Sequence, residues 1–572
     1  MVIEDTPSLL QVDNLSVDFL RDGDWYNVVR KVSFALQRGR TLGIVGESGS
    51  GKSVTCMSLM RLLPENLSRV GGHAFFAPAG EKKAVDLLSL QEKEMCGLRG
   101  CRISMIFQEP MTSLNPVHRC GDQVVEMLRR HERVTYEEAR RRVLDLFEEV
   151  RLPRPEKLFR SYPHEISGGQ KQRVMIAMAL VCHPDLVIAD EPTTALDVTV
   201  QHDILALLKQ LQTKYNIGVI FITHDLGVVA QVADDVVVMY RGDVVEAGPA
   251  SQVLYHPEHP YTQGLLACRP PIDSRPKRLP TVTDFLEGKP NQSEPSDQSD
   301  QSDNSQLSIL NSQLVKVRNL TVTYPLKRSF FGRTLQELRA VDDVSFDIYK
   351  GETLGLVGES GCGKSTLGRA LLRLIPFQLG QVVYDGTDLS TLAEDEMRRL
   401  RTQIQIVFQD PFSSLNPHLT VGDAILEPLV VHHACDSMKA CRQRVAELVE
   451  QVGLPADSVG RYPHEFSGGQ RQRIVIARAL ALKPRFVICD ESVSALDVSV
   501  QAQVLNLLND LKRQFGYTYL FITHDLSVVK FLSDRILVMQ QGRIVEQGAA
   551  DELYAHPQKE YTKRLLAAIP RL

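Results

Sequence analysis

The 572-residue sequence has no apolar run that is long enough to cross a membrane. Its longest apolar stretches, such as Val174–Cys182 and Leu186–Ala189, stop well short of the ~18–20 residues that a membrane-spanning helix needs. The first residues, MVIEDTPSLLQVDN, lack the basic start and apolar core of a secretory signal. We therefore expect a chain that has no membrane-spanning segment and stays in the cytoplasm.

Cysteine pairs and long basic stretches are also missing. The ten cysteines occur singly, with no Cys-x-x-Cys pair, which argues against a structural zinc site and against a disulfide framework. The 65 basic and 70 acidic residues nearly balance at a formal charge of −5, and no Lys/Arg block stands out. Because nucleic-acid binding leaves a basic footprint in a sequence, we expect no nucleic-acid partner.

What the sequence does contain is a long internal repeat. ALDVTVQ at 195–201 recurs as ALDVSVQ at 495–501, and FITHDL at 221–226 recurs unchanged at 521–526, both at an offset of 300 residues. This period is far longer than the about 20–50 residues of a solenoid unit. The chain also exceeds the about 250–300 residues at which a single core stops growing. We predict two homologous domains, residues 1–286 and 311–572.

The segment between the two repeats has a different composition. Residues 287–310 read EGKPNQSEPSDQSDQSDNSQLSIL, which is rich in Ser, Asp, Gln, Asn and Pro and poor in apolar side chains. Such a segment cannot bury enough surface to offset the entropy that ordering would cost. We predict a flexible acidic linker; an ordered surface loop is the alternative.

Short apolar runs alternate with helical patterns in each repeat. TLGIVG (41–46), DLVIAD (185–190) and GVIFITHD (218–225) are rich in Val, Ile and Leu and are bounded by turns or charges. Strands that are buried on both faces of a mainly parallel sheet have this composition. The fold class that we predict is α/β.

A glycine-rich loop follows the first of these strands in each repeat. The loops read GESGSGKS and GESGCGKS and match the pattern Gly-x4-Gly-Lys-Ser/Thr. Their backbone N–H groups and the following helix would hold phosphates, the lysine would reach the β- and γ-phosphates, and the serine would bind Mg²⁺. The residues that we assign to this P-loop function are Gly46, Ser48, Gly49, Gly51, Lys52 and Ser53, with Gly358, Ser360, Gly361, Gly363, Lys364 and Ser365.

Each repeat also has a pair of carboxylates at the end of a buried strand. Asp190 ends DLVIAD and Asp490 ends RFVICD, which suits a carboxylate near the metal of a phosphoryl-transfer site. Glu191 and Glu491 follow directly. A pair of solvated residues at a strand end is the alternative interpretation.

Together with these motifs, the segments ISGGQ (166–170) and FSGGQ (466–470) make the chain resemble the ATP-binding cassette (ABC) family over nearly its whole length except the linker. In that family this signature precedes a helix. In this chain the run QKQRVMIAMALV (170–181) predicts that the helix is amphipathic. The resemblance implies two tandem P-loop ATPase domains, each with a mainly parallel sheet and a helical subdomain that carries the signature. The signature residues are Ser167, Gly168, Gly169 and Gln170, with Ser467, Gly468, Gly469 and Gln470.

The family arrangement implies that the two domains face each other head to tail with ATP between them. Carried over, it pairs Lys52 with Ser467 in site one and Lys364 with Ser167 in site two. Glu191 and Glu491 would act as general bases, and His224 and His524 would hold the γ-phosphate and the attacking water. The further ATP-binding residues would be Gln108, Gln409, Asp197 and Asp497, with Phe19 and Tyr324 stacking on adenine; the Mg²⁺ ligands would be Ser53, Gln108, Asp190, Ser365, Gln409 and Asp490.

Two further repeats resemble the peptide and nickel import branch of this family. QEPMTSLNP (108–116) recurs as QDPFSSLNP (409–417), and HPEHPYTQGLLACRP (256–270) recurs as HPQKEYTKRLLAAIP (556–570). The resemblance implies importer tails at about 254–286 and 554–572; simple terminal packing is the alternative role for them. Because Cys268 is the only cysteine in either tail, we expect no iron–sulfur cluster.

An importer ATPase without spanning segments implies separate partners. We expect two transmembrane permease subunits, an external substrate-binding protein, and a peripheral position at the cytoplasmic face of the bacterial inner membrane. Di- and oligopeptides are the first expected substrates, and nickel or glutathione are the alternatives. A twin-cassette ATPase of translation or DNA repair is the rival class, but the chain has neither a long charged helical linker nor Cys-x-x-Cys modules or long heptads.

Overall fold

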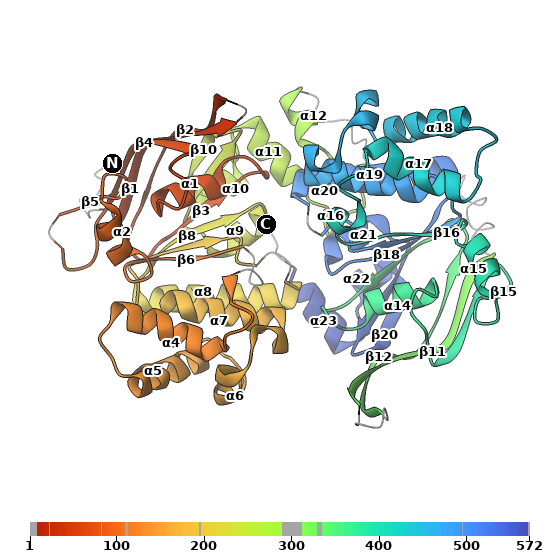
Figure 1. Cartoon of the computed structure of the whole chain (residues 1–572), viewed down its shortest axis with the longest axis horizontal. Helices are drawn as coiled ribbons and strands as arrows, with labels where there is room; N and C mark the ends of the chain where they lie inside the picture. Colours follow the sequence, from red (N-terminus) through yellow and green to blue (C-terminus); the bar gives the residue numbers. More distant parts are fainter. Residues whose placement is uncertain are drawn as a thin grey trace.

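The computed structural model describes residues 8–21, 23–81, 83–108, 113–193, 196–288, 312–328, 334–494 and 496–569. It contains two similar halves, here called copy one (up to residue 288) and copy two (from residue 312), which lie side by side (Figure 1). The predicted linker lies outside the described residues from residue 289 onward. Among the helices that the structure describes, none combines the length and the apolar character that spanning a membrane requires.

The larger sheet of copy one is a mainly parallel sheet. Its strands lie in the order β10 (Asp243–Pro249), β9 (Asp235–Tyr240), β3 (Thr41–Val45), β8 (Gly218–Thr223), β7 (Leu186–Asp190) and β6 (Ile103–Ile106), and only β10 runs antiparallel to its neighbour. Every residue of β3, β7 and β8 is buried, which explains their continuous apolar runs. The predicted α/β class is confirmed.

A second, antiparallel sheet covers one face of the larger sheet. Its strands lie in the order β2 (Asp24–Leu36), β1 (Leu10–Arg21), β4 (Ser68–Phe76) and β5 (Val85–Asp86). Helices α1 (Lys52–Leu59) and α2 (Glu92–Leu98) contribute Cys56, Leu59 and Met95 to the apolar core between the sheets. The core therefore surrounds the helix that follows the glycine loop.

Helices cover the opposite face of the larger sheet. They are α4 (Cys120–His131), α5 (Tyr136–Glu149), α6 (Pro155–Arg160), α7 (Gly168–Leu180), α8 (Val198–Tyr215) and α9 (Leu226–Val232). The prediction of an amphipathic α7 is wrong, because α4 and α5 pack on this helix as well as β6, so most of its residues are buried, Lys171 and Gln172 included. The helices α10 (Ala250–Tyr255), α11 (Pro260–Ala267) and α12 (Val282–Leu286) follow the last strand of copy one.

Copy two repeats this architecture. The strands of its antiparallel sheet lie in the order β12 (Thr334–Tyr349), β11 (Gln313–Arg328), β14 (Leu379–Tyr384) and β15 (Thr387–Asp388). The strands of its larger sheet lie in the order β16 (Ile404–Val407), β17 (Phe486–Asp490), β18 (Thr518–Ile522), β13 (Thr353–Val357), β19 (Arg535–Gln540) and β20 (Arg543–Ala549). Its helices are α14 (Lys364–Leu371), α15 (Glu394–Leu400), α16 (Pro411–Ser414), α17 (Val421–Val431), α18 (Met438–Gln451), α19 (Gly468–Leu480), α20 (Val498–Phe515), α21 (Leu526–Leu532), α22 (Ala550–Ala555) and α23 (Glu560–Ala567).

The two copies are arranged head to tail. The helices α4, α5 and α6 lie at the bottom of copy one in Figure 1, whereas α17 and α18 lie at the top of copy two. One apolar cluster contains buried residues of both copies, among them Val229, Tyr261 and Leu279 of copy one and Val504, Leu508 and Phe531 of copy two. The boundary between the copies is therefore part of a common core.

Candidate active sites

The glycine loop of each copy closes around the amino group of its own lysine. Lys52 Nζ donates hydrogen bonds to the carbonyl oxygens of Gly46 at 2.7 Å and Glu47 at 2.9 Å. Gly46 has a φ of 152°, and a Cβ built there would lie 2.2 Å from the carbonyl oxygen of Met239, so this position needs glycine. Burial lowers the pKa of Lys52, although nearby carboxylates, Glu191 first among them, act in the opposite direction.

The loop of copy two has the same geometry. Lys364 Nζ donates to the carbonyl oxygens of Gly358 at 2.8 Å and Glu359 at 3.0 Å. The helices that follow the two loops, α1 and α14, begin at the lysines themselves. Their N-terminal N–H groups therefore face the loop, which is the arrangement that binds phosphate.

Each copy places a hydroxyl beside the carboxylate at the end of a buried strand. Ser53 Oγ donates to Asp190 Oδ1 at 3.0 Å, and Ser365 Oγ donates to Asp490 Oδ1 at 2.7 Å. Burial raises the pKa of both aspartates. Among the described residues no group of three or more His, Cys, Asp or Glu side chains could hold a metal by itself. The paired oxygen atoms suit Mg²⁺, which usually takes one or two protein ligands together with phosphates and waters.

Glu191 is held between two side chains in copy one. Gln108 Nε2 donates to its Oε2 at 3.0 Å, and His224 Nδ1 lies 3.3 Å from its Oε1. Its backbone has a φ of 45°, in the left-handed region, and its N–H donates to the carbonyl oxygen of Ile222 at 3.0 Å. A left-handed conformation costs a non-glycine residue about 1–2 kcal/mol, which the neighbouring strand bond offsets in part.

Glu491 has the corresponding surroundings in copy two. Gln409 Nε2 donates to its Oε2 at 2.7 Å, His524 Nδ1 lies 3.7 Å from the same oxygen, and Lys364 Nζ lies 3.9 Å from Oε1. Burial by itself would raise the pKa of Glu491, but the hydrogen bond and the charge of His524 outweigh it and lower the pKa. The carboxylate is therefore ionised and able to accept a proton from water.

The two histidines have pKa values above the ordinary one. Burial opposes the charge of His224, but the hydrogen bond and the negative charge of Glu191 outweigh burial and raise the pKa. Glu491 raises the pKa of His524 in the same way. Because a raised pKa keeps the imidazole charged to higher pH, these side chains can stabilise negative charge that develops on a phosphate.

The signature of each copy begins a buried helix. Ser167 caps α7: its Oγ accepts from the N–H of Gln170 at 3.3 Å, and Gln170 Oε1 accepts from the N–H of Ser167 at 3.1 Å. A Cβ at Gly169 would lie 2.7 Å from Val200 Cγ1 of α8, whereas one at Gly168 meets nothing closer than 3.9 Å. Packing therefore requires the second glycine, and the first leaves open space before the helix.

The same relations recur at the signature of copy two. The N–H of Gln470 donates to Ser467 Oγ at 3.4 Å, and Gln470 Oε1 accepts from Ser467 at 3.0 Å. A Cβ at Gly469 would lie 2.1 Å from Val500 Cγ1 of α20, whereas one at Gly468 would meet no atom within 4 Å. The signature of copy two is thus packed against the first turn of α20.

The glycine loops contact the start of α8 or α20 in the opposite copy. The N–H of Ser48 donates to Asp497 Oδ2 at 3.0 Å, and the N–H of Ser360 donates to Asp197 Oδ1 at 2.5 Å. Asp497 directly precedes α20, whose Val500 packs on the signature of copy two. Loop one is therefore brought to the same turn of α20 as signature two, and loop two is related to signature one in the same way.

The glutamate that directly precedes each of these serines also contacts the opposite copy. Thr199 Oγ1 of α8 donates to Glu359 Oε1 at 3.1 Å, and Ser499 Oγ of α20 donates to Glu47. Both glutamates occupy the second position of a glycine loop, and both hydroxyl groups lie two residues beyond the aspartate that the neighbouring loop residue contacts. Each loop is therefore attached to the opposite copy at two consecutive residues.

The aromatic residues lie on corresponding strands of the antiparallel sheets. Phe19 of β1 is paired with Tyr26, two residues before Val28, whose carbonyl oxygen lies beside Gly51. Tyr324 of β11 is paired with Leu338, two residues before Ala340, whose carbonyl oxygen lies beside Gly363. The strand pairing thus places both residues a few positions from the backbone that meets the end of a glycine loop, and their role in stacking on adenine stays a prediction.

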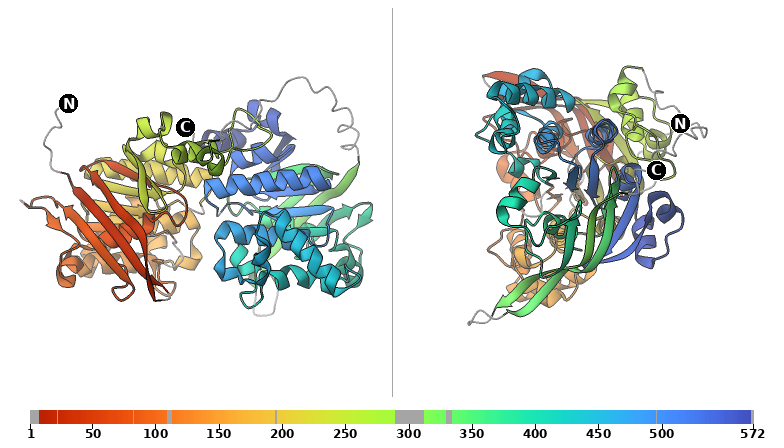
Figure 2. Two further views of the ribbon diagram at one scale, coloured as in Figure 1. Left: turned by 90° about the horizontal axis from the view of Figure 1, so that it is seen from above. Right: turned by 90° about the vertical axis from the view of Figure 1, so that its right-hand side faces the viewer.

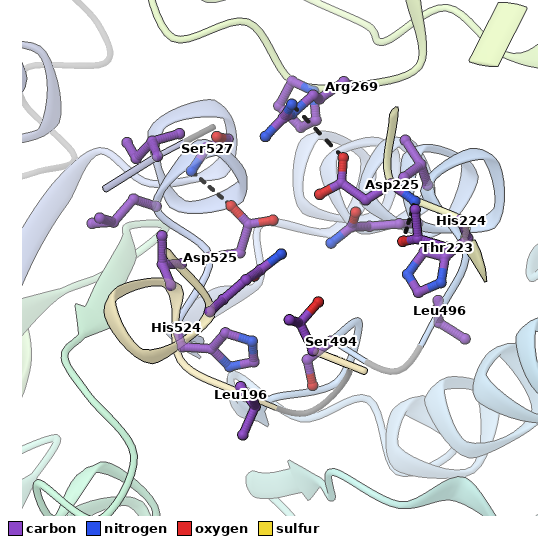
Figure 3. A pocket seen from close by; sticks show the side chains of 18 residues that line it. Leu196, Thr223, His224, Asp225, Arg269, Ser494, Leu496, His524, Asp525 and Ser527 are labelled. Carbon is purple, nitrogen blue, oxygen red and sulfur yellow. Dashed lines mark hydrogen bonds and ion pairs between the residues drawn. The ribbon is translucent and has the colours of Figure 1, made fainter. Parts of the chain in front are cut away.

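A small cavity of about 120 Å³ lies between the copies, with His224 on one side and His524 on the other (Figure 3). Arg269 reaches into it from the end of α11, and its Nη1 lies 3.8 Å from Asp225 Oδ1. A Cβ at Gly227 would lie 1.7 Å from that guanidinium nitrogen, so glycine at this position makes room for the arginine. The corresponding residues of copy two are Ser527 and Ile569, which makes the cavity asymmetric.

Sequence reasoning missed a contact between each tail and the glycine loop of the same copy. The N–H of Glu47 donates to Tyr261 Oη at 3.0 Å, and the N–H of Glu359 donates to Tyr561 Oη at 3.1 Å. The signal was present, because a Tyr-Thr pair occurs at the same place in both tail repeats. The tails therefore do more than pack at the end of each copy.

Replacing Tyr261 by Phe should weaken ATP binding at the loop of copy one by about 3–10-fold, because the N–H of Glu47 loses its acceptor in a region that water reaches poorly. ATP titration in a Lys364→Ala background would isolate this loop. Tyr255→Phe, which alters an exposed tyrosine of the same tail, is the matched control. Equal affinities of the two phenylalanine variants would contradict the positioning role.

The chain is similar in sequence to known proteins over most of its length. The profile of the ABC transporter family matches residues 29–194 and 341–494, and the profile of the oligopeptide/dipeptide transporter C-terminal region matches 245–293 and 545–572. The glutathione import ATP-binding proteins GsiA of Escherichia coli (strain K12) and of Shigella boydii serotype 4 are each 48% identical, over 99% of this chain and 90% of their own length. A solved dimeric ATP-binding cassette with bound ADP and Pi is 30% identical and covers 41% of this chain and 99% of its own, with a TM-score of 0.38.

Proposed function

Because the chain belongs to the ABC transporter ATP-binding family, we propose that it carries two composite ATP sites, each built from the glycine loop of one copy and the signature of the other. The chain is an importer ATPase with two cassettes. The observation that supports the composite sites is the pair of reciprocal bonds from Ser48 to Asp497 and from Ser360 to Asp197.

In site one, Lys52 and the loop N–H groups bind the phosphates of ATP, and Ser467 of the opposite signature closes on the γ-phosphate. Glu191 takes the proton from the attacking water, while the imidazole of His224, whose pKa is raised by Glu191, stabilises the phosphate and orients that water. Site two uses Lys364, Ser167, Glu491 and His524 in the same roles. The protein contributes position and electrostatics, which is most of what phosphoryl transfer requires.

When Mg²⁺ is bound together with ATP, it supplies positive charge against the phosphates, and the side chains that would hold it are Ser53, Asp190 and Gln108 in site one and Ser365, Asp490 and Gln409 in site two. In each site the serine and the aspartate are already hydrogen-bonded to each other. The amide nitrogen of each glutamine bonds the catalytic glutamate, which leaves its oxygen for the metal shell.

We further propose that ATP hydrolysis drives import of short peptides, with glutathione as the first candidate. The tail profile belongs to oligopeptide and dipeptide transporters, and the relatives at 48% identity are named for glutathione import. The partners would be two transmembrane permeases and an external substrate-binding protein. The chain would then sit peripherally at the cytoplasmic face of the bacterial inner membrane.

The experiment is purification of the tagged chain from membranes, followed by ATPase assays of the complex in lipid vesicles. We expect two permeases to co-purify, and we expect glutathione-loaded binding protein to stimulate hydrolysis more than a dipeptide-loaded one. Stimulation by dipeptides alone would replace glutathione with a peptide substrate. Co-purification with ribosomes and no permease would contradict import.

A further inference from the structure

The chain that follows α11 in copy one leaves its own copy and lies on copy two. In the view from above, this green segment extends over the blue helices of copy two (Figure 2). The N–H of Leu279 donates to Asn506 Oδ1 of α20 at 2.9 Å, and Asn506 Nδ2 donates to the carbonyl oxygen of Leu279 at 2.8 Å. Leu279 is 1% exposed and Asn506 is 3% exposed. One buried amide therefore satisfies both backbone groups of a residue from the other copy.

Charged side chains extend this contact along α20 and α21. Arg275 Nε donates to the carbonyl oxygen of Phe531 at 3.0 Å, and Arg278 Nη1 lies 3.1 Å from Asp510 Oδ2. Arg513 Nη2 donates to the carbonyl oxygen of Lys277 at 3.3 Å. Because exposed ion pairs contribute little stability, the buried hydrogen bonds between Leu279 and Asn506 determine the register of the segment on α20. The contacts of Arg275, Arg278 and Arg513 align the rest of the segment around that point.

Both ends of the segment are anchored in copy one. Cys268, at the end of α11, is fully buried, and α12 begins at Val282 and packs back on α11. A Cβ at Gly264 of α11 would lie 2.9 Å from Val282 Cα, so glycine allows this close approach. Residues 269–281 therefore form a loop that starts and ends on the same helix of copy one, and they move with that copy.

Copy one does not offer the same receiving surface. At the offset of 300 residues, Asn506 corresponds to Ala206 and Arg513 to Thr213, so the side chains that bond the segment in copy two have no equivalent there. The corresponding place on copy one is a groove of about 770 Å³ that Ala206, Thr213 and Gln231 help to line. The contact is thus specific to one pairing: the segment of copy one with the α20 and α21 surface of copy two.

We propose that residues 269–281 form a clasp that keeps copy one attached to copy two at α20 and α21 while the ATP sites open and close. The proposal rests on the composite sites proposed above. Asp497, which contacts loop one, lies nine residues before Asn506 in the chain, or about 14 Å along a helix. The start of α20 can therefore separate from loop one while the middle of α20 stays bound to the clasp. Loss of nucleotide would leave the clasp contacts in place, because they involve no nucleotide.

The linker and the clasp would have different effects on the two copies. If the linker is flexible, as its composition predicts, it would raise the effective concentration of one copy near the other without fixing their orientation. The clasp provides a defined register through buried hydrogen bonds. After release of ATP the copies would therefore remain in position for the next closure.

The test is association of the two copies after the linker has been cut. A specific protease site is inserted between residues 291 and 305 of the full chain, and the folded protein is cleaved after purification. Without nucleotide, the two halves should stay associated at micromolar concentration. Asn506→Ala should weaken this association at least tenfold, since it removes both hydrogen bonds and leaves two buried backbone groups without a partner.

Matched variants separate the clasp from a general effect on α20. Alanine already occupies the Asn506 position in copy one, so the helix tolerates it, and circular dichroism together with ATP binding would verify folding. Asn509→Ala, on the same helix, is the control, because its amide has no hydrogen bond to the described part of the tail. Leu279→Ser on the clasp side should weaken association too, and the two substitutions combined should weaken it by less than their separate effects multiplied together.

Separation of the wild-type halves without nucleotide would overturn the clasp, and so would equal association of Asn506→Ala and Asn509→Ala. In a Glu191→Gln, Glu491→Gln background, ATP should bring the Asn506→Ala halves together again. If ATP fails to do so while the wild-type halves associate without it, the composite sites are wrong and the clasp stands. The two proposals therefore fail in distinguishable ways.

Discussion

Glu191→Gln should reduce hydrolysis at site one by about 10²–10⁴-fold and leave ATP bound there. Glutamine has the shape of glutamate and can still accept a hydrogen bond from Gln108, but it cannot take a proton from water. Single-turnover hydrolysis and retention of labelled ATP would measure both effects. Glu191→Asp shortens the side chain but keeps a base, so it should recover part of the rate.

The same substitution tests which signature completes which site. Ser467→Arg places a bulky cation at the signature that we pair with Lys52, so combining it with Glu191→Gln should damage site one only. Ser167→Arg combined with Glu191→Gln should damage both sites, and residual hydrolysis should be lower. Glu491→Gln supplies the mirror experiment with the two serines exchanged. Equal residual activity of all four pairs, with folding and ATP binding intact, would contradict either the head-to-tail pairing or the independence of the sites.

Lys52→Ala should weaken ATP binding at site one by about 10–100-fold. The buried ammonium group forms charge-assisted hydrogen bonds with phosphate, each of which is worth about 1.5–3 kcal/mol. The substitution also removes the bonds from Lys52 Nζ to the loop carbonyl oxygens, so the loop loses its closed form as well. Equilibrium titration with ATP in a Lys364→Ala background would report site one alone.

Lys93→Ala, at an exposed position of α2, is the matched control for the loss of a positive charge. It should leave the affinity for ATP unchanged, because the charge is exposed to solvent. Wild-type affinity at both sites in the Lys52→Ala, Lys364→Ala double variant would contradict the assignment of the glycine loops. The assignment predicts that this double variant binds ATP weakly at both sites.

The fold class and the family could be predicted from the sequence because the evidence for them is local. The buried strands β3, β7 and β8 appear as continuous apolar runs, and each glycine loop is a single stretch of eight residues. The expectation of an amphipathic α7 was wrong for a tertiary reason. Helices α4 and α5 pack on α7 in addition to strand β6, so most of its residues are buried, polar ones such as Lys171 and Gln172 included.

The sequence by itself determined which chemical groups are present, their order along the chain and their duplication, because a phosphate loop or a buried strand is made by neighbouring residues. Only the tertiary structure decided that Ser48 contacts Asp497, that Tyr261 reaches the glycine loop, and that Leu279 lies on Asn506. The partners in each of these pairs are more than 200 residues apart. Such contacts depend on how the two copies and their tails pack together, and no local pattern of side chains specifies that packing.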